Sequence, residues 1–233
     1  MPRYILIDTE TTGLRWDEGH RVFEIGMVET LDLKTISREI NIPLNPDHKL
    51  SEESMMICKV TDHKLAQYKF FADEADKFLN FIYKGHTDDD PTILIAHNAK
   101  FDIGFLNNEL SLCNKSNLSD FQILDTVKIA KKLYPGRPAS LNELCKRFKI
   151  DLNERDEKGH GALLDVKLLY KIFLFLIDGK THDEIVNFNK EVEDFVGFKK
   201  RIKPLTKRVF KNIIFDEKMH LDVLEKIKCQ NVW

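Results

Sequence analysis

The sequence predicts an α/β domain with a mixed sheet and flanking helices, followed by a separate C-terminal segment. Short hydrophobic runs of strand type come first, and segments with helical spacing then alternate with further strand-type runs. This order is typical of mixed-sheet α/β folds. The composition changes after Gly179, where a stretch rich in basic residues begins. We therefore expect a folded domain over residues 1–179 and a flexible linker with a terminal helix over residues 180–233.

Three expected strands and one helix occupy the first part of the chain. Tyr4–Ile7 is a hydrophobic run that ends at the polar Asp8, the pattern of a central strand that runs into a loop. Two further strands are expected at Val22–Leu33 and Ile36–Leu44, where hydrophobic and polar residues alternate imperfectly. Phe70–Tyr83 carries hydrophobic residues at helical spacing, which predicts an amphipathic helix.

Strands and helices alternate in the rest of the domain. Asp125 is suited to cap a helix that ends near Tyr134, because a Pro-Gly pair follows. The other expected elements are strands at Thr92–Ala96 and Phe121–Leu124 and helices at Lys100–Leu112, Leu141–Phe148 and Ala162–Ile177.

Composition excludes several classes of protein. The chain has 233 residues with 36 Lys and Arg against 38 Asp and Glu, so it is not a strongly basic protein that grips nucleic acid by bulk charge. The longest hydrophobic run, Ile172–Ile177, is too short to span a bilayer, and Asp8 and Glu10 interrupt any signal peptide. The four cysteines are far apart, which argues against a zinc ribbon or a disulfide scaffold. We expect a protein of a reducing cytoplasm without a membrane partner.

Asp8 and Glu10 are the first candidate metal ligands. Residues two apart on a strand face the same side, so these two carboxylates converge at the end of the sheet. They repel each other unless a cation lies between them, and Mg²⁺ prefers such oxygen ligands. Alone, the pair is also compatible with an ordinary polar strand end, but it is part of the longer string Asp-Thr-Glu-Thr-Thr-Gly at residues 8–13.

Two more segments carry candidate residues. Asp102 follows the strand Thr92–Ala96 and would lie at the start of a helix, where acidic residues are common for electrostatic reasons alone. His160 would lie on the loop that enters the last helix, and Asp165 would project from the first turns of that helix. Four carboxylates match the charge of two divalent cations, and a histidine can act as a base near neutral pH. Together they form the set required for two-metal phosphodiester hydrolysis.

The strings DTETTG, HNAKFDIGFL and HGALLD, in this order, resemble the three motifs of the DEDDh 3′→5′ exonuclease family. Over residues 3–178 the chain is most similar to the epsilon (proofreading) subunits of bacterial DNA polymerase III. The resemblance implies a ribonuclease-H-like fold and stepwise removal of 3′-terminal nucleotides as monophosphates. An alternative is a DEDDh exoribonuclease that trims RNA 3′ ends. A non-catalytic scaffold is a further alternative, which the intact set of carboxylates disfavours.

The resemblance also implies roles for individual residues. Two divalent cations, Mg²⁺ or Mn²⁺, would be held by Asp8, Glu10, Asp102 and Asp165, and His160 would be the general base. The residues implied to contact the substrate are Asp8, Glu10, Thr11, Leu14, Glu53 and Asp165. Thr11 would meet the terminal 3′-hydroxyl through its backbone, and Leu14 would wedge against the terminal bases. The chain departs from the family at Cys58-Lys59, where relatives carry His-Gly, which puts substrate contact there in doubt.

The C-terminal segment has its own resemblance. Lys199–Lys211 contains seven basic residues and no acidic one, and a helix is expected at Glu217–Ile227. Leu221, Leu224 and Ile227 would form a hydrophobic stripe on a helix that is too short to be stable alone. The segment resembles the part of epsilon subunits that attaches to the polymerase (alpha) subunit, although it could also fold back onto its own domain. The clamp-binding peptide of the family has no match around Thr181–Phe188, which weakens the case for a clamp contact.

Overall fold

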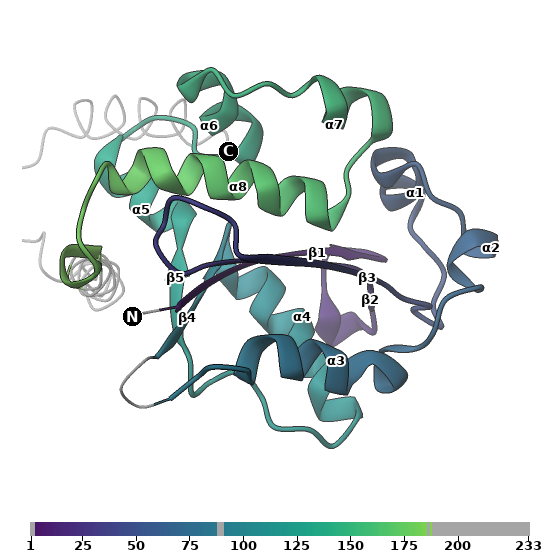
Figure 1. Ribbon diagram of the computed structural model, residues 1–233. Coiled ribbons are helices and arrows are strands. Elements are labelled where there is room, and N and C mark those ends of the chain that lie inside the picture. Colours follow the sequence, from purple (N-terminus) through teal and green to yellow (C-terminus); the bar gives the residue numbers. More distant parts are fainter. Residues whose placement is uncertain (1–2, 88–90, 186, 188–233) are drawn as a thin grey trace, which may run out of the picture. The chain divides into compact units, whose positions relative to one another are not determined.

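The computed structural model describes residues 3–87, 91–185 and 187. Its centre is a five-stranded sheet with the strand order β3-β2-β1-β4-β5 (Figure 1). The strands are β1 (Arg3–Thr11), β2 (Val22–Thr30), β3 (Arg38–Pro43), β4 (Thr92–Ala96) and β5 (Gln122–Asp125). The first three are antiparallel, whereas β4 and β5 run parallel to β1. The sequence prediction of a mixed sheet with a central first strand is therefore confirmed.

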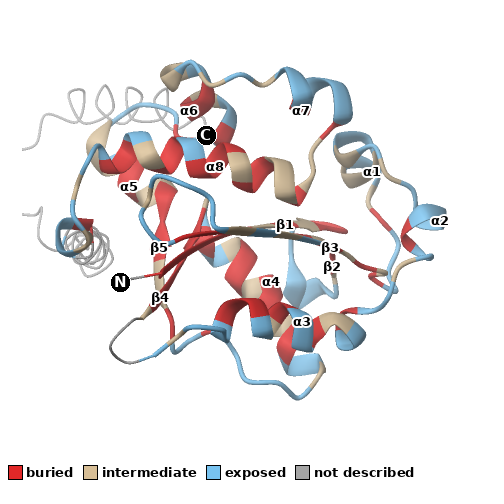
Figure 2. Ribbon diagram, in the orientation of Figure 1, coloured by how far each residue is buried: buried red, intermediate tan, exposed pale blue. Residues whose placement is uncertain are grey.

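Helices cover both faces of the sheet (Figure 1). One face packs against α5 (Thr126–Leu133), α6 (Leu141–Phe148) and α8 (Ala162–Ile177), and the other packs against α3 (Phe71–Tyr83) and α4 (Ala99–Leu112). Side chains of β1 alternate between the two cores, with Leu6 on the α8 side and Ile7 on the α4 side. Figure 2 shows the buried residues on the sheet and on the helix faces turned toward it. By the same alternation, Asp8 and Glu10 lie on the face that α8 covers.

Some elements differ from the sequence prediction. β1 continues through Asp8 to Thr11 instead of ending in a loop, because Asp8 and Glu10 pair with Gly26 and Glu24 of β2. β2 ends at Thr30, three residues earlier than expected, and the chain turns through Leu33 with a φ of 58°. Four short elements were not predicted from the sequence: the helices α1 (Glu52–Cys58), α2 (Asp62–Leu65) and α7 (Asn153–Lys158) and the 3-10 helix η1 (Trp16–Glu18). Each is too short to show a helical hydrophobic pattern.

Gly26 allows α8 to begin very close to the sheet. A Cβ atom at this position would lie 2.2 Å from the carbonyl carbon of Ala162, the first residue of α8. Gly26 is also the residue that pairs with Asp8. The missing side chain therefore brings the start of α8 against the part of the sheet that carries Asp8.

We expect Gly26→Ala to destabilise the protein by about 1–3 kcal/mol, because the new methyl group overlaps main-chain atoms that cannot move alone. The start of α8 should also shift. Protein that remains folded should therefore have a lower activity than the wild type, if that activity depends on His160 and Asp165. Thermal unfolding and nuclease activity of the folded fraction would measure both effects. Gly161→Ala is the matched control, because its Cβ would lie 3.7 Å from the Glu24 carboxylate, an ordinary contact. Equal stability of the two variants would contradict this account of Gly26.

Candidate active site

The predicted site residues come together at the end of β1 that lies nearest to the start of α8. Asp8 and Glu10 are on β1, Asp102 is in the first turn of α4, and Asp165 is in the first turn of α8. His160 lies in the loop directly before α8, as the sequence predicted. Three segments that are far apart in the sequence therefore supply one cluster.

Asp102 is fixed to β1 by two hydrogen bonds. Its Oδ1 atom accepts them from the backbone N–H of Thr9 at 3.0 Å and from the Thr9 hydroxyl at 2.8 Å. The helix α4 can begin directly after β4 because Asn98 adopts a left-handed conformation with a φ of 66°, which Asn tolerates better than most residues. The turn after β4 thereby brings the Asp102 carboxylate beside the strand that carries Asp8 and Glu10.

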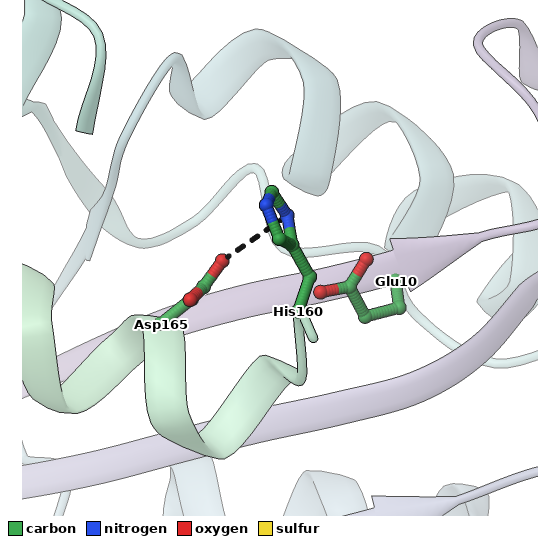
Figure 3. A group of neighbouring side chains, drawn as sticks. All are labelled: Glu10, His160 and Asp165. Carbon is green, nitrogen blue, oxygen red and sulfur yellow. Dashed lines mark ion pairs between the residues drawn. The ribbon is translucent and has the colours of Figure 1, made fainter. Parts of the chain in front are cut away.

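Glu10, His160 and Asp165 form the tightest part of the cluster (Figure 3). One potential ligand atom from each lies within 4.8 Å of the others. His160 Nδ1 is 3.7 Å from Asp165 Oδ2. The other Asp165 oxygen, Oδ1, is buried and has no hydrogen-bond partner in the described part of the chain. Because a buried carboxylate oxygen without a partner is costly, this atom points to a ligand that completes the site.

Burial and mutual repulsion strongly perturb the carboxylates. Burial raises the pKa of Glu10 to about 8, and repulsion by Asp165 adds to this while a hydrogen bond from Cys58 opposes it. Burial also raises the pKa of Asp102 to about 7, against the hydrogen bonds from Thr9. The pKa of Asp8 lies well above its usual range, because of burial and then repulsion by Asp102 and Asp165. Without added positive charge, the four carboxylates cannot all ionise at neutral pH.

This set of donors fits hard divalent cations. Carboxylate oxygens are the ligands that Mg²⁺ and Mn²⁺ prefer, and bound cations would reverse the pKa shifts by attracting the ionised forms. The unpartnered Oδ1 atom of Asp165 and the repulsion around Asp8 are both relieved by such ions. The residues present therefore agree with the metal site that the sequence predicted.

Arg155 of α7 is a site residue that the sequence analysis missed. Its side chain is buried, and its Nη2 atom donates to Asp165 Oδ2 at 2.6 Å and lies 3.1 Å from His160 Nδ1. A further hydrogen bond joins Arg155 Nη1 to Asn142 of α6. Burial, and then the Arg155 charge, lower the pKa of His160, so the basic form is favoured.

The Cys58-Lys59 pair, which departs from the family pattern, ties α1 to the site. The Cys58 thiol donates a hydrogen bond to Glu10 Oε2 at 3.1 Å. Burial, and then the Glu10 charge, raise the pKa of this thiol, so it remains a proton donor. Lys59 Nζ donates to the backbone carbonyls of Asp156 and Glu157 in α7, at 3.1 and 2.8 Å. The pair therefore stabilises the surroundings of the site, a role that the substitution alone did not reveal.

Three of the residues expected to contact the substrate, Thr11, Leu14 and Glu53, belong to β1, to the loop after it and to helix α1. Thr11 ends β1, and its carbonyl oxygen accepts a hydrogen bond from the Ser54 hydroxyl of α1 at 2.9 Å. Leu14 is 73% exposed in the loop after β1. Glu53 is exposed in the first turn of α1, outside the carboxylate cluster.

Comparisons with known protein sequences agree with this geometry. Residues 5–173 match the family model described as Exonuclease, RNase T. The chain is 34% identical to the DNA polymerase III subunit epsilon of Buchnera aphidicola subsp. Schizaphis graminum, an alignment that covers 97% of each chain. It is also 34% identical to the subunit of the same name from Rickettsia prowazekii, over 93% of this chain and 96% of the relative.

Solved structures show the same fold. The structure titled "Exonuclease X in complex with 5' overhanging duplex DNA" aligns with a TM-score of 0.59 at 22% identity, over 80% of this chain and 99% of the other. An exonuclease I structure aligns with a TM-score of 0.65 at 15% identity, over 85% of this chain and 44% of the other. At these identities the likeness establishes the fold. In the described residues, no helix is both long and hydrophobic enough to cross a membrane.

Proposed function

The chain belongs to the exonuclease family and, within it, to the DNA polymerase III epsilon subunits, and we infer that it removes mispaired 3′-terminal nucleotides from DNA during replication. It is a metal-dependent 3′→5′ exonuclease that acts with DNA polymerase III. The observation that carries this function is the convergence of Asp8, Glu10, Asp102, Asp165 and His160 on one end of β1. The same relatives support a location in the bacterial cytoplasm.

Two divalent cations, Mg²⁺ or Mn²⁺, are proposed to be held by Asp8, Glu10, Asp102 and Asp165. When bound, they supply positive charge that stabilises the phosphodiester during attack and eases deprotonation of water. The carboxylates keep this charge at the end of β1, where the backbone of Thr9 holds Asp102 in place. Two observations support this proposal: the four residues offer only carboxylate oxygens as ligands, and the repulsion between these carboxylates is relieved by bound cations.

His160 is proposed to be the general base. Its neutral imidazole can take the proton from the attacking water, and burial together with Arg155 favours this neutral form at physiological pH. Arg155 links the His160 loop to Asp165, because its Nη2 atom donates to Asp165 Oδ2 and lies 3.1 Å from His160 Nδ1. The backbone N–H of His160 also donates to Ile57 O of α1 at 3.0 Å, which fixes the loop from a second side.

Substrate contacts are proposed from the family resemblance and from position. Asp8, Glu10 and Asp165 would lie beside the scissile phosphate, and Thr11 follows directly on β1. The exposed side chain of Leu14 is available to contact the terminal bases. Glu53 is proposed as a substrate residue because α1 is hydrogen-bonded to Thr11.

Degradation of 3′-labelled single strands tests the function, with DNA and RNA compared in Mg²⁺ and in chelator. We expect mononucleotide release from the 3′ end of DNA, faster than from RNA and stopped by chelation. A marked preference for RNA would instead support the alternative of an RNA-trimming exonuclease. One structural neighbour is titled "3'-end specific recognition of histone mRNA stem-loop by 3'-exonuclease", which keeps this alternative open at the level of the fold.

The C-terminal segment is proposed to bind the alpha subunit of the polymerase. Its hydrophobic stripe of Leu221, Leu224 and Ile227, and the resemblance to the alpha-binding part of epsilon subunits, support this partner. Residues 186 and 188–233 of this segment lie outside the described residues, and the proposed division into residues 1–179 and 180–233 remains a sequence prediction.

Truncation of the C-terminal segment tests whether DNA degradation and binding to the alpha subunit depend on different parts of the chain. Ile185 packs into the core and the Tyr4 hydroxyl lies 2.7 Å from His182 Nδ1, so the cut belongs after residue 187 rather than at 180. We expect the truncated protein to degrade single-stranded DNA at the full-length rate but to lose binding to the alpha subunit. Size-exclusion chromatography with purified alpha subunit measures the binding. A truncated protein that still elutes with alpha would place the partner surface in the exonuclease domain.

A further inference from the structure

The loop between β1 and β2 is firmly anchored beside the site. Thr11 pairs with Val22, and the backbone N–H of Thr12 donates to the carbonyl of Arg21 at 2.9 Å, so the loop projects from the end of β1 that carries the carboxylates. Arg21 forms two hydrogen bonds with the buried Glu109 carboxylate of α4, at 2.8 and 2.7 Å. These contacts fix both ends of the loop, one to the sheet and one to α4.

Trp16 lies on this loop with its indole against α4. A Cβ atom at Gly104 would lie 2.8 Å from the indole Nε1 atom, so the absence of a side chain at Gly104 lets the ring pack on the helix. Gly104 comes two residues after Asp102, about 3 Å further along the helix axis and on another face of α4, because successive helical residues are about 100° apart. Trp16 nevertheless remains 44% exposed, and Leu14 on the same loop is 73% exposed. A partly exposed aromatic ring is therefore held on α4, in the loop that leaves β1 directly after the carboxylate-bearing residues.

We propose that Trp16 is a stacking platform for a base of the single-stranded substrate, upstream of the nucleotide that is removed. This rests on the proposed function, because the carboxylate cluster sets where the scissile phosphate lies. Base–aromatic stacking suits an enzyme that must accept any sequence, since every base has a π-face. A ring already packed on Gly104 loses little conformational freedom on binding. The net charge of −2 leaves little bulk attraction for DNA, so a local contact of this kind has a clear use.

Two substrates separate stacking from chemistry in the full-length protein. Trp16→Ala should raise KM for single-stranded oligothymidylate about tenfold, the usual scale of one lost stacking contact, with kcat little changed. Hydrolysis of the 4-nitrophenyl ester of thymidine 5′-monophosphate, which has only one base, should stay at the wild-type rate. Trp16→Phe should recover most of the oligonucleotide affinity. Phe175→Ala is the control for loss of an exposed aromatic residue, since Phe175 lies at the opposite end of α8 from Asp165.

Gly104→Ala offers a second test that leaves Trp16 in the sequence. The new methyl group displaces the indole, while Ala is a better helix former than Gly, so binding should weaken without loss of stability. Direct binding can be followed with Ca²⁺ in place of Mg²⁺ in a Trp233→Phe background, where Trp16 is the remaining tryptophan. Oligothymidylate should then quench the Trp16 fluorescence.

The outcomes distinguish failure of the proposed exonuclease function from failure of the proposal that Trp16 stacks on a base. If the wild-type protein degrades neither substrate, the proposed function fails and the stacking proposal falls with it. If the wild-type protein degrades both but Trp16→Ala slows both equally, Trp16 has a structural role and only the stacking proposal is overturned. Unchanged KM for oligothymidylate and no quenching would also overturn it, and would leave the ring as a candidate contact for a protein partner.

Discussion

Asp8→Asn should lower the rate of 3′-nucleotide release by about 10³-fold or more, because loss of cation binding removes several kcal/mol of transition-state stabilisation. Asp8 lies between Asp102, Asp165 and Glu10, each of which raises its pKa by repulsion after the larger effect of burial. An amide of nearly the same shape keeps the packing but removes the charge that attracts cations. The fold should therefore remain intact, and the metal-free variant should unfold at a temperature no lower than that of the metal-free wild type.

Release of labelled nucleotide in Mg²⁺ and thermal unfolding in chelator measure these two effects. Asp76→Asn is a matched control, because Asp76 is exposed and pairs with Lys115 away from the site. It should leave the rate unchanged. Substantial activity in purified Asp8→Asn protein would rule out the two-metal assignment. A variant that is inactive because it is unfolded would instead give no cooperative transition.

The hydrophobic core and the five central site residues could be predicted from the sequence for a physical reason. Strand β4 and helices α6 and α8 have long or uniform hydrophobic patterns, and their observed bounds match the expected ones. The catalytic candidates lie at strand ends and helix starts, where local sequence dictates geometry. Asp102 follows a buried strand, and Asp165 follows the loop that opens α8. Local pattern was therefore sufficient to place Asp102, His160 and Asp165, although it ended the first strand before Asp8.

Arg155 and Cys58 could not be predicted, because their roles depend on contacts between distant elements. Arg155 stands in the charged run Asn153–Lys158, which has the pattern of a solvated surface, and it is buried only because α6 and α8 supply Asn142 and Asp165. Cys58 reaches Glu10 through the short helix α1, whose hydrophobic pattern is too brief to recognise. Both cases involve elements of fewer than eight residues, for which tertiary contacts rather than periodicity decide the structure.

The metal-free protein should lose stability as the pH rises from 6.5 to 8.5. The folded state has raised pKa values of about 8 for Glu10 and about 7 for Asp102, whereas both groups titrate near 4 in the unfolded chain. Between these limits the folded state binds more protons, so the free energy of unfolding decreases with increasing pH. The effect should be on the order of 1–3 kcal/mol, or about 2–10 °C in Tm.

The range of pH 6.5–8.5 is chosen because other groups with shifted pKa values affect stability mainly at lower pH. Burial lowers the pKa of His97 to about 4 and also lowers that of His160, which makes stability rise with pH below about 6.5 and opposes the carboxylates there. For Glu29, burial is outweighed by hydrogen bonds from Arg38, Ser37 and Arg3, which lower its pKa to about 2, so its contribution is lost only in acid. Above pH 6.5 the change in the free energy of unfolding is therefore set mainly by Glu10 and Asp102, whose pKa values are raised.

Mg²⁺ should cancel this loss, because cations stabilise the ionised carboxylates of the folded state alone. The increase in Tm on adding Mg²⁺ should be larger at pH 8.5 than at pH 6.5, as measured by thermal scans with matched chelator samples. Glu10→Gln removes one titrating group, so its Tm in chelator should depend less on pH. A metal-free Tm that stays level or rises over this range would mean that burial does not raise the pKa values of Glu10 and Asp102 in the folded protein. Burial of several carboxylates in one place both costs stability without cations and favours cation binding, so the stability cost and the proposed catalytic use of the site have one origin.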